Sequence, residues 1–326
     1  MASYPPAKTF VYKVDPSGHQ IECDVHMPEN ITKPAPVIIW LHYSGMIAEN
    51  RHVVGTSIIY SSTKRGYILV IPDYRLAPQA KIDEIYSDVE DCAKWVRTVL
   101  PKALGEGVVD TSRLVVGGGS CGGQLALTTG LYLNPPPVAV ISLYALTDPT
   151  DADYNTPTKP NPPCARDTLI SWAEVEPYMG PNAPMESHPE NGCDLPKLIL
   201  TKRALVYGYV LQEGIYLPTV YGEMSVEDIR AKWVIAPNIT SRFPPTFVSH
   251  GGGDRYVPAS QSEAVVQALQ KAGVEHVWYH VPGYDHGFDV YDMHAGEEGA
   301  LDKEFAAKLW PWLEKVVRGG EGGVGC

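Results

Sequence analysis

The run Arg113-Leu-Val-Val-Gly-Gly-Gly-Ser-Cys-Gly-Gly123 joins an apolar strand to a helix-forming stretch that begins at Gln124. Its centre, residues 118–122, follows the pattern Gly-x-Ser-x-Gly. A strand that turns sharply into a helix strains the residue at the bend, and flanking glycines remove Cβ atoms that would clash with the neighbouring chain. The pattern therefore predicts that Ser120 presents its hydroxyl at a sheet edge, above a helix N-terminus. The alternative is a glycine-rich turn with an incidental serine.

Apolar runs and helical spacings alternate on both sides of this turn. We expect strands within 8–27 (two, joined by a turn at 15–18) and at 37–42, 67–72, 113–117, 138–144, 245–250 and 276–281. We expect helices at 52–65, 82–99, 124–132, 258–272 and 298–318. This order predicts an α/β fold with a central, mostly parallel eight-stranded sheet and helices on both faces.

Residues 147–243 interrupt the alternation. Proline is dense from 149 to 184, and a Tyr/Leu-rich, helical-looking segment follows at 195–235. We therefore expect 147–243 to form a cap or lid insertion over the sheet edge, on an α/β core made of residues 1–146 and 244–318. The glycine-rich end, 319–326, is predicted to be disordered.

Composition narrows the class of partner. The chain has 326 residues, is 44% hydrophobic and carries a net charge of −12 without a Lys/Arg-rich run, which argues against nucleic acid and anionic membranes. The first residues lack the apolar core of a secretory signal, and no apolar run is long enough to span a bilayer. Six scattered cysteines predict reduced thiols in the cytoplasm and no metal site. A homodimer is plausible from the terminal helices or edge strands.

A serine hydroxyl needs a positioned base, and that base needs an orienting acid. In the strand–turn–helix arrangement these follow in the order serine, acid, histidine, each on a loop after a strand. Asp254 follows the strand at 245–250, and His286 follows the strand at 276–281. Loops at the carboxyl ends of parallel strands meet at one edge of the sheet. We therefore predict Ser120 as nucleophile, His286 as general base and Asp254 as the acid that orients it.

Other titratable residues near these loops have weaker roles. Asp285 and Asp289 are the alternative acids, and His250 and His280 are expected to lie in the core because they stand inside strands. The thiol of Cys121 is expected to point into the fold behind the turn, because free cysteine most often packs as a small hydrophobic residue.

The reaction also needs backbone N–H groups where negative charge develops, each worth about 3–4 kcal/mol. One donor is the amide of Cys121, at the start of the helix. The others are expected in the loop His42-Tyr-Ser-Gly-Met46, which follows the strand at 37–42. No metal or organic cofactor is expected for this chemistry.

Several motifs together resemble the hormone-sensitive-lipase and arylacetamide-deacetylase branch of the α/β-hydrolases. They are the loop at 42–45, Pro72-Asp-Tyr-Arg-Leu-Ala-Pro78, the serine turn at 118–123, Thr147-Asp-Pro149, Gly253-Asp254 and Asp285-His-Gly-Phe288. The resemblance covers residues 8–316 and implies the α/β-hydrolase fold. It also implies that the amides of Ser44 and Gly45 complete the oxyanion hole. Within this branch, the chain is similar to carboxylesterase-like enzymes of fungal natural-product pathways.

The chain departs from the branch pattern at four positions. Tyr43 and Ser44 replace the middle glycines of a His-Gly-Gly-Gly loop, Gly119 replaces the usual acidic residue, and Cys121 replaces the usual alanine. The side chain of Tyr43 or Ser44 either narrows the acyl pocket, or donates a hydrogen bond to a substrate, or reflects neutral drift. None of these changes removes a backbone donor, so hydrolysis is still expected.

Aromatic residues are frequent in the insertion. Tyr207, Tyr209 and Tyr216, together with Tyr43, are candidate substrate contacts, because pockets are lined mostly by aromatic and aliphatic side chains. The alternative for each is packing inside the cap itself. As a group they favour a bulky apolar or aromatic ester as the small-molecule substrate.

Three functions are compatible with these residues. The first is hydrolysis of a carboxylic ester through an acyl-enzyme. The second uses the same three residues for acyl transfer, cyclisation or elimination on a polyketide-like intermediate. The third, a non-catalytic receptor, would need a damaged triad, whereas all three members are present.

Overall fold

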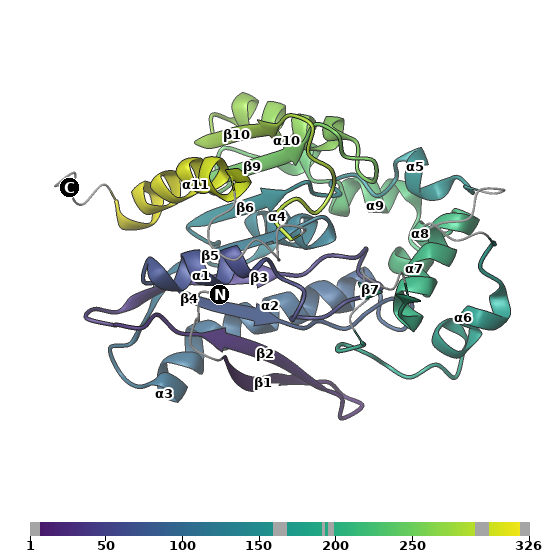
Figure 1. Cartoon of the computed structure of the whole chain (residues 1–326), viewed down its shortest axis with the longest axis horizontal. Helices are drawn as coiled ribbons and strands as arrows, with labels where there is room; N and C mark the ends of the chain where they lie inside the picture. Colours follow the sequence, from purple (N-terminus) through teal and green to yellow (C-terminus); the bar gives the residue numbers. More distant parts are fainter. Residues whose placement is uncertain (1–6, 159–167, 191–192, 195–198, 291–299, 320–326) are drawn as a thin grey trace.

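The structure is a computed structural model that describes residues 7–158, 168–190, 193–194, 199–290 and 300–319. Its centre is an eight-stranded sheet in the order β1-β2-β4-β3-β5-β6-β9-β10 (Figure 1). The strands are β1 (Lys8–Val14), β2 (Gln20–His26), β3 (Ala35–Leu41), β4 (Ile68–Pro72), β5 (Val109–Gly119), β6 (Ala139–Leu143), β9 (Thr246–Gly251) and β10 (His276–Val281). Strands β1 and β2 pair antiparallel, as do β2 and β4, and all other pairs are parallel. The predicted mostly parallel eight-stranded sheet is confirmed.

Helices cover both faces of this sheet, as predicted (Figure 1). Helices α1 (Thr56–Lys64) and α11 (Ala300–Arg318) share a core cluster with Ile38 and Trp40 of β3. Helices α2 (Ile82–Thr98), α4 (Cys121–Tyr132) and α10 (Ala259–Ala272) share the other cluster with Val37, Ile39 and Leu41. Alternate residues of β3 therefore enter opposite cores, which explains why this strand is apolar throughout. A short helix, α3 (Leu100–Leu104), follows α2.

Helix α1 begins at Thr56, four residues later than the sequence predicts. The segment before it makes other backbone contacts: the amide of Arg51 donates to the Asp73 carboxylate at 2.8 Å, and the amide of His52 donates to the Asn50 side chain at 2.9 Å. Gly55 itself has a non-helical backbone, with φ of −59° and ψ of 126°, so the helix starts only after it.

The region 147–243 contains short elements that lie outside the sheet. They are α5 (Ala152–Asn155), α6 (Trp172–Met179), β7 (Cys193–Asp194), β8 (Ile199–Leu200), α7 (Lys202–Glu213), α8 (Tyr216–Tyr221), α9 (Val226–Trp233) and the 3-10 helix η1 (Ala236–Asn238). Helices α5, α6, α7 and α8 lie together at one end of the sheet (Figure 1). The boundaries of the insertion stay a prediction, and the predicted disordered tail lies outside the described residues from 320 onward.

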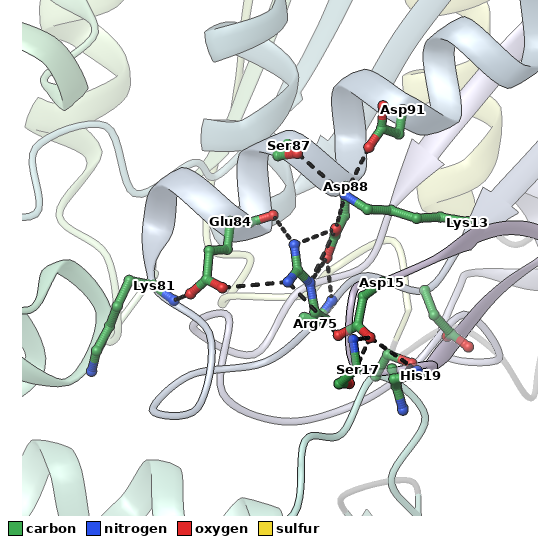
Figure 2. Close-up of polar contacts among 12 residues, drawn as sticks. Lys13, Asp15, Ser17, His19, Arg75, Lys81, Glu84, Ser87, Asp88 and Asp91 are labelled. Carbon is green, nitrogen blue, oxygen red and sulfur yellow. Dashed lines mark hydrogen bonds and ion pairs between the residues drawn. The ribbon is translucent and has the colours of Figure 1, made fainter.

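A buried ion cluster fixes the segment that follows β4. The Arg75 guanidinium donates hydrogen bonds to both oxygens of the Asp88 carboxylate in α2, from Nε at 2.9 Å and from Nη2 at 2.8 Å (Figure 2). Lys13 of β1 approaches the same carboxylate at 2.6 Å and Asp91 at 2.7 Å. Because the Asp88 side chain is fully buried, both cations are needed to offset its desolvation.

No described helix combines the length and the apolar character that a membrane crossing requires.

Candidate active site

Ser120 stands at the bend between β5 and α4, in the strained backbone conformation that the sequence predicts. Its φ is 54° and its ψ is −124°. The bend is tied to the end of β6: the Ser120 amide donates to Leu143 O at 2.9 Å, and the Leu146 amide donates to Ser120 O at 3.3 Å. Gly122 cannot carry a side chain, because a Cβ there would collide with the Leu41 carbonyl oxygen. The close approach of these backbones explains the glycine two positions after Ser120.

The predicted acid and base are brought together. Asp254 lies three residues after β9 and His286 five residues after β10, and His286 Nδ1 lies 2.8 Å from Asp254 Oδ2. The opposite oxygen, Oδ1, accepts the amides of Tyr256 at 2.8 Å and Val257 at 2.9 Å. The Asp254 side chain is 1% exposed and the His286 side chain 16%. The two loops thus place a buried carboxylate next to a partly accessible imidazole.

The two alternative acids are engaged elsewhere. Asp285 pairs with Arg255, whose Nε lies 2.7 Å from Oδ2, and it also accepts the backbone amide of His286. Asp289 accepts the hydroxyl of Tyr144. Asp254 is therefore the carboxylate that bonds to the ring of His286.

Competing effects set the charge of Asp254. Burial raises the pKa of its carboxyl group. The opposing effects are larger and leave that pKa well below its ordinary value of 3.8: they are the interactions with His250 and His286, the charge of His286 and the hydrogen bond from the Val257 amide. The group is consequently an anion at neutral pH, which is the state that stabilises an imidazolium.

Tyr144 connects the serine turn with the histidine loop. Its ring lies edge-on to His286, with centroids 4.6 Å apart, and its hydroxyl fills the space that a side chain at Gly119 would need. Among the described residues, no hydrogen bond joins Ser120 directly to His286. Such bonds are often long in unliganded enzymes and tighten when substrate binds. Tyr144 was not predicted as a site residue. The available signal was Gly119, because a glycine in place of the acidic residue of the family pattern leaves room for another side chain.

The predicted oxyanion loop has an unusual backbone. Ser44, Gly45 and Met46 all have positive φ, at 80°, 65° and 62°. The Met46 amide donates to Cys121 Sγ at 3.2 Å, so the loop is fastened to the start of α4. Three consecutive residues in the left-handed region turn the chain tightly beside Ser120, and their conformation is held by these contacts.

The thiol of Cys121 is fully buried, as predicted. Burial raises its pKa from 9.0 to about 11, although hydrogen bonds with Tyr74 and the Met46 amide lower it in part. The protonated thiol is a poor nucleophile at neutral pH, so it packs and accepts hydrogen bonds beside the serine.

Two of the candidate tyrosines contact the oxyanion loop. The ring of Tyr207 lies directly against Gly45, and the hydroxyl of Tyr216 donates to the Gly45 carbonyl at 3.4 Å. Tyr209 packs beside Trp172, with ring centroids 6.0 Å apart, and Tyr43 is half-buried against the core. Tyr216 is fully buried, so its visible role is support of the loop. Substrate contact by these four residues stays a prediction.

The two strand histidines differ. His250 is fully buried, as predicted, but its Nε2 also lies 3.2 Å from Asp254 Oδ2, a contact that sequence reasoning missed. The spacing His250-x-x-x-Asp254 at a strand end was the available signal. The prediction that His280 lies in the core is wrong: its side chain is exposed and its ring stacks beside Trp278. It stands near the end of β10, an edge strand of the sheet, where one face meets solvent.

Comparisons with known families agree with this architecture. Residues 23–160 match the BD-FAE family, and residues 224–318 match the prolyl oligopeptidase family. The non-reducing polyketide synthase ascC of Acremonium egyptiacum is 30% identical over an alignment of 305 residues that covers 86% of this chain. The chain spans only 14% of the length of that synthase.

Solved structures show the same fold. An alpha/beta hydrolase superfamily protein from Enterococcus faecalis superposes with a TM-score of 0.68 at 19% identity, covering 96% of this chain and 100% of that one. A fungal esterase from Rhizomucor miehei superposes with a TM-score of 0.64 at 17% identity, covering 97% and 86%. The hormone-sensitive-lipase branch stays a prediction from the motifs. With this sheet order and a strained serine between β5 and α4, the chain has the α/β-hydrolase fold.

Proposed function

We propose that this chain is a serine hydrolase of carboxylic esters, with Ser120 as nucleophile, His286 as general base and Asp254 as the acid. The observation that carries the proposal is the 2.8 Å contact between His286 Nδ1 and the buried Asp254 carboxylate, formed by two strand-end loops beside the serine turn. Engaging Nδ1 leaves Nε2 of the same ring for the serine proton. The similarity to esterases of the same fold supports this assignment.

The chemistry follows from these positions. Ser120 Oγ attacks the ester carbonyl carbon while His286 Nε2 takes the hydroxyl proton, and Asp254 stabilises the imidazolium. The amides of Ser44, Gly45 and Cys121 hold the negative charge of the tetrahedral intermediate. The imidazolium then returns its proton to the leaving alcohol, and an acyl-Ser120 remains. Water, deprotonated by the same imidazole, releases the carboxylic acid and regenerates the serine.

The substrate class follows from the residues around the loop. Tyr207 borders Gly45, and the half-buried Tyr43 follows His42 on the same segment. Aromatic surfaces bind apolar groups with little loss of side-chain entropy, so a bulky apolar or aromatic ester fits better than a short polar one.

A series of aryl esters tests the activity and the substrate class together. Wild-type protein is expected to release free acid from aryl esters, with a higher kcat/KM for bulky acyl groups than for acetate, whereas Ser120→Ala releases none. Equal acid release by wild type and Ser120→Ala contradicts the nucleophile assignment. A strict preference for acetate contradicts the substrate class alone.

A second candidate function has its own support. The curated relative is a polyketide synthase, and this chain matches one segment of it. The same acyl-Ser120 would then be attacked by a hydroxyl or amine of the substrate instead of water, which gives acyl transfer or cyclisation. Mass analysis of the products separates the two: free acid supports hydrolysis, and an acylated or cyclised product without free acid supports the alternative.

A further inference from the structure

His250 lies beside the carboxylate of Asp254, which we propose as the catalytic acid. It is the fifth residue of β9, and its ring is fully buried. Ring Nε2 lies 2.9 Å from Val257 O and 3.2 Å from Asp254 Oδ2, while Nδ1 lies 2.7 Å from the Ser262 hydroxyl of α10. Both ring nitrogens therefore have partners, and one of these partners is the acid proposed to serve His286.

The partners determine which nitrogen carries a proton. A backbone carbonyl and an ionised carboxylate only accept hydrogen bonds, so Nε2 of His250, which faces both, must carry the proton, and it donates that proton to Val257 O. In the neutral ring, Nδ1 then accepts from the hydroxyl of Ser262. The surrounding backbone and α10 fix one tautomer, whose single N–H is donated to Val257 O and lies within 3.2 Å of the Asp254 carboxylate.

The carboxylate of Asp254 consequently has donors on both oxygens. Oδ1 accepts two backbone amides, from Tyr256 and Val257, whereas Oδ2 bonds to His286 and lies 3.2 Å from Nε2 of His250. Rotation about the Cβ–Cγ bond moves both oxygens of the carboxylate, and the two backbone amides restrain it at Oδ1 alone. The contact from His250 restrains that rotation, so Oδ2 keeps its direction toward His286 Nδ1.

We propose that His250 is a positioning residue that fixes the plane of the Asp254 carboxylate and so orients His286. This inference rests on the proposed function of Ser120, Asp254 and His286. It differs from a packing role, because an aromatic side chain of similar bulk without an N–H donor would fill the same space but would not restrain Oδ2.

Two substitutions separate these roles. His250→Phe keeps an aromatic ring and removes the donor, and His250→Gln places an amide N–H near the position of Nε2. His280→Phe is the matched control, because position 280 pairs with 250 in the parallel register of β9 and β10 but is exposed. For aryl esters, we expect His250→Phe to lower kcat by about 10-fold to 100-fold with KM changed less than about 2-fold. His250→Gln should recover most of that loss, and His280→Phe should match wild type.

A spectroscopic readout tests the same inference without turnover. In Ser120→Ala protein, the proton between His286 Nδ1 and Asp254 should give a low-field NMR resonance that persists in His250→Gln and broadens or vanishes in His250→Phe. If the resonance depends on His250 while wild-type protein hydrolyses no ester, the positioning role holds and the proposed function fails.

Other outcomes overturn the proposal. An unchanged resonance and unchanged kcat in a folded His250→Phe protein reduce His250 to a packing residue. Equal losses in His250→Gln and His250→Phe lead to the same conclusion. Should both variants fail to fold, nitrogen-15 labelling of histidine in the unsubstituted chain still decides: an unprotonated Nε2 at His250 refutes the proposed donor.

Discussion

The edge of the Tyr144 ring meets the imidazole of His286, with ring centroids 4.6 Å apart and ring planes inclined by 61°. The Tyr144 hydroxyl donates to Asp289, three residues after His286 in the chain. One tyrosine at the end of β6 thus supports both the imidazole and its loop, and it does so from the space beside Gly119.

Tyr144→Phe should keep the edge-to-face contact between the aromatic ring and His286 but remove the hydrogen bond to Asp289. Because that carboxylate is buried, losing a donor is expected to lower the free energy of unfolding by about 2 kcal/mol. We also expect a several-fold lower kcat, because the histidine loop loses one restraint. Chemical denaturation and aryl-ester kinetics measure the two effects. Asp289→Asn, whose amide oxygen still accepts the phenol, should lose less activity, and the reverse order would contradict this role.

Gly45→Ala should disable the oxyanion loop. Position 45 has a φ of 65°, and a Cβ there would collide with the ring of Tyr207. We expect kcat for aryl esters to fall about 100-fold, the size of the effect of losing an oxyanion donor, with a smaller change in KM. The double substitution with Tyr207→Ala removes the collision and should recover part of kcat. No recovery in the double variant would mean that the backbone strain, and not the tyrosine, causes the loss.

Cys121→Ala should lower stability in a pH-dependent way. The pKa of this thiol is raised from 9.0 to about 11, so the contribution of the buried thiol is fully present below pH 9 and disappears as pH rises toward 11. The difference in unfolding free energy between wild type and Cys121→Ala should therefore shrink between pH 8 and pH 11, by about 2–3 kcal/mol at most. Urea titrations at both pH values measure it. A difference that stays constant or grows would show that the thiol ionises at least as easily in the folded chain as in the unfolded one.

Asp88→Asn should destabilise the fold without changing the chemistry. It leaves Arg75 and Lys13 with one anionic partner fewer in a buried site, which typically costs about 3–5 kcal/mol. Asp91→Asn is the control, because that side chain is 42% exposed and its ion pair with Lys13 should contribute less than about 1 kcal/mol. Equal effects of the two substitutions on the denaturation midpoint would contradict the role assigned to Asp88. Both folded variants should keep the wild-type KM.

Much of this architecture was predictable from local patterns. The apolar runs that became β3, β4 and β5 are buried on both faces, and glycines flank Ser120 because backbones approach closely there. The pairing of Asp254 with His286 followed from their places after two strands, since parallel strands deliver such loops to one edge.

The features that the sequence did not predict depend on contacts between distant segments. Tyr144 reaches Asp289 across 145 residues, and no local pattern at either position indicates that bond. Helix α1 starts only after Gly55, whose non-helical backbone lies directly against the carbonyl of Asp289 from a distant loop. His280 lies inside an apolar strand, as core residues do, and it is exposed because β10 is at the edge of the sheet.

The central claim is that the imidazole of His286, oriented by Asp254, activates the hydroxyl of Ser120. Mass spectrometry after treatment with a fluorophosphonate probe tests it directly, because only an activated serine reacts at an appreciable rate. We predict stoichiometric labelling on the peptide that contains Ser120 in wild type, none in Ser120→Ala, and labelling in His286→Ala and Asp254→Asn slower by about 10⁴-fold. Labelling of Ser120 at the same rate in wild type and His286→Ala, or no labelling of the folded wild-type chain, would contradict the claim.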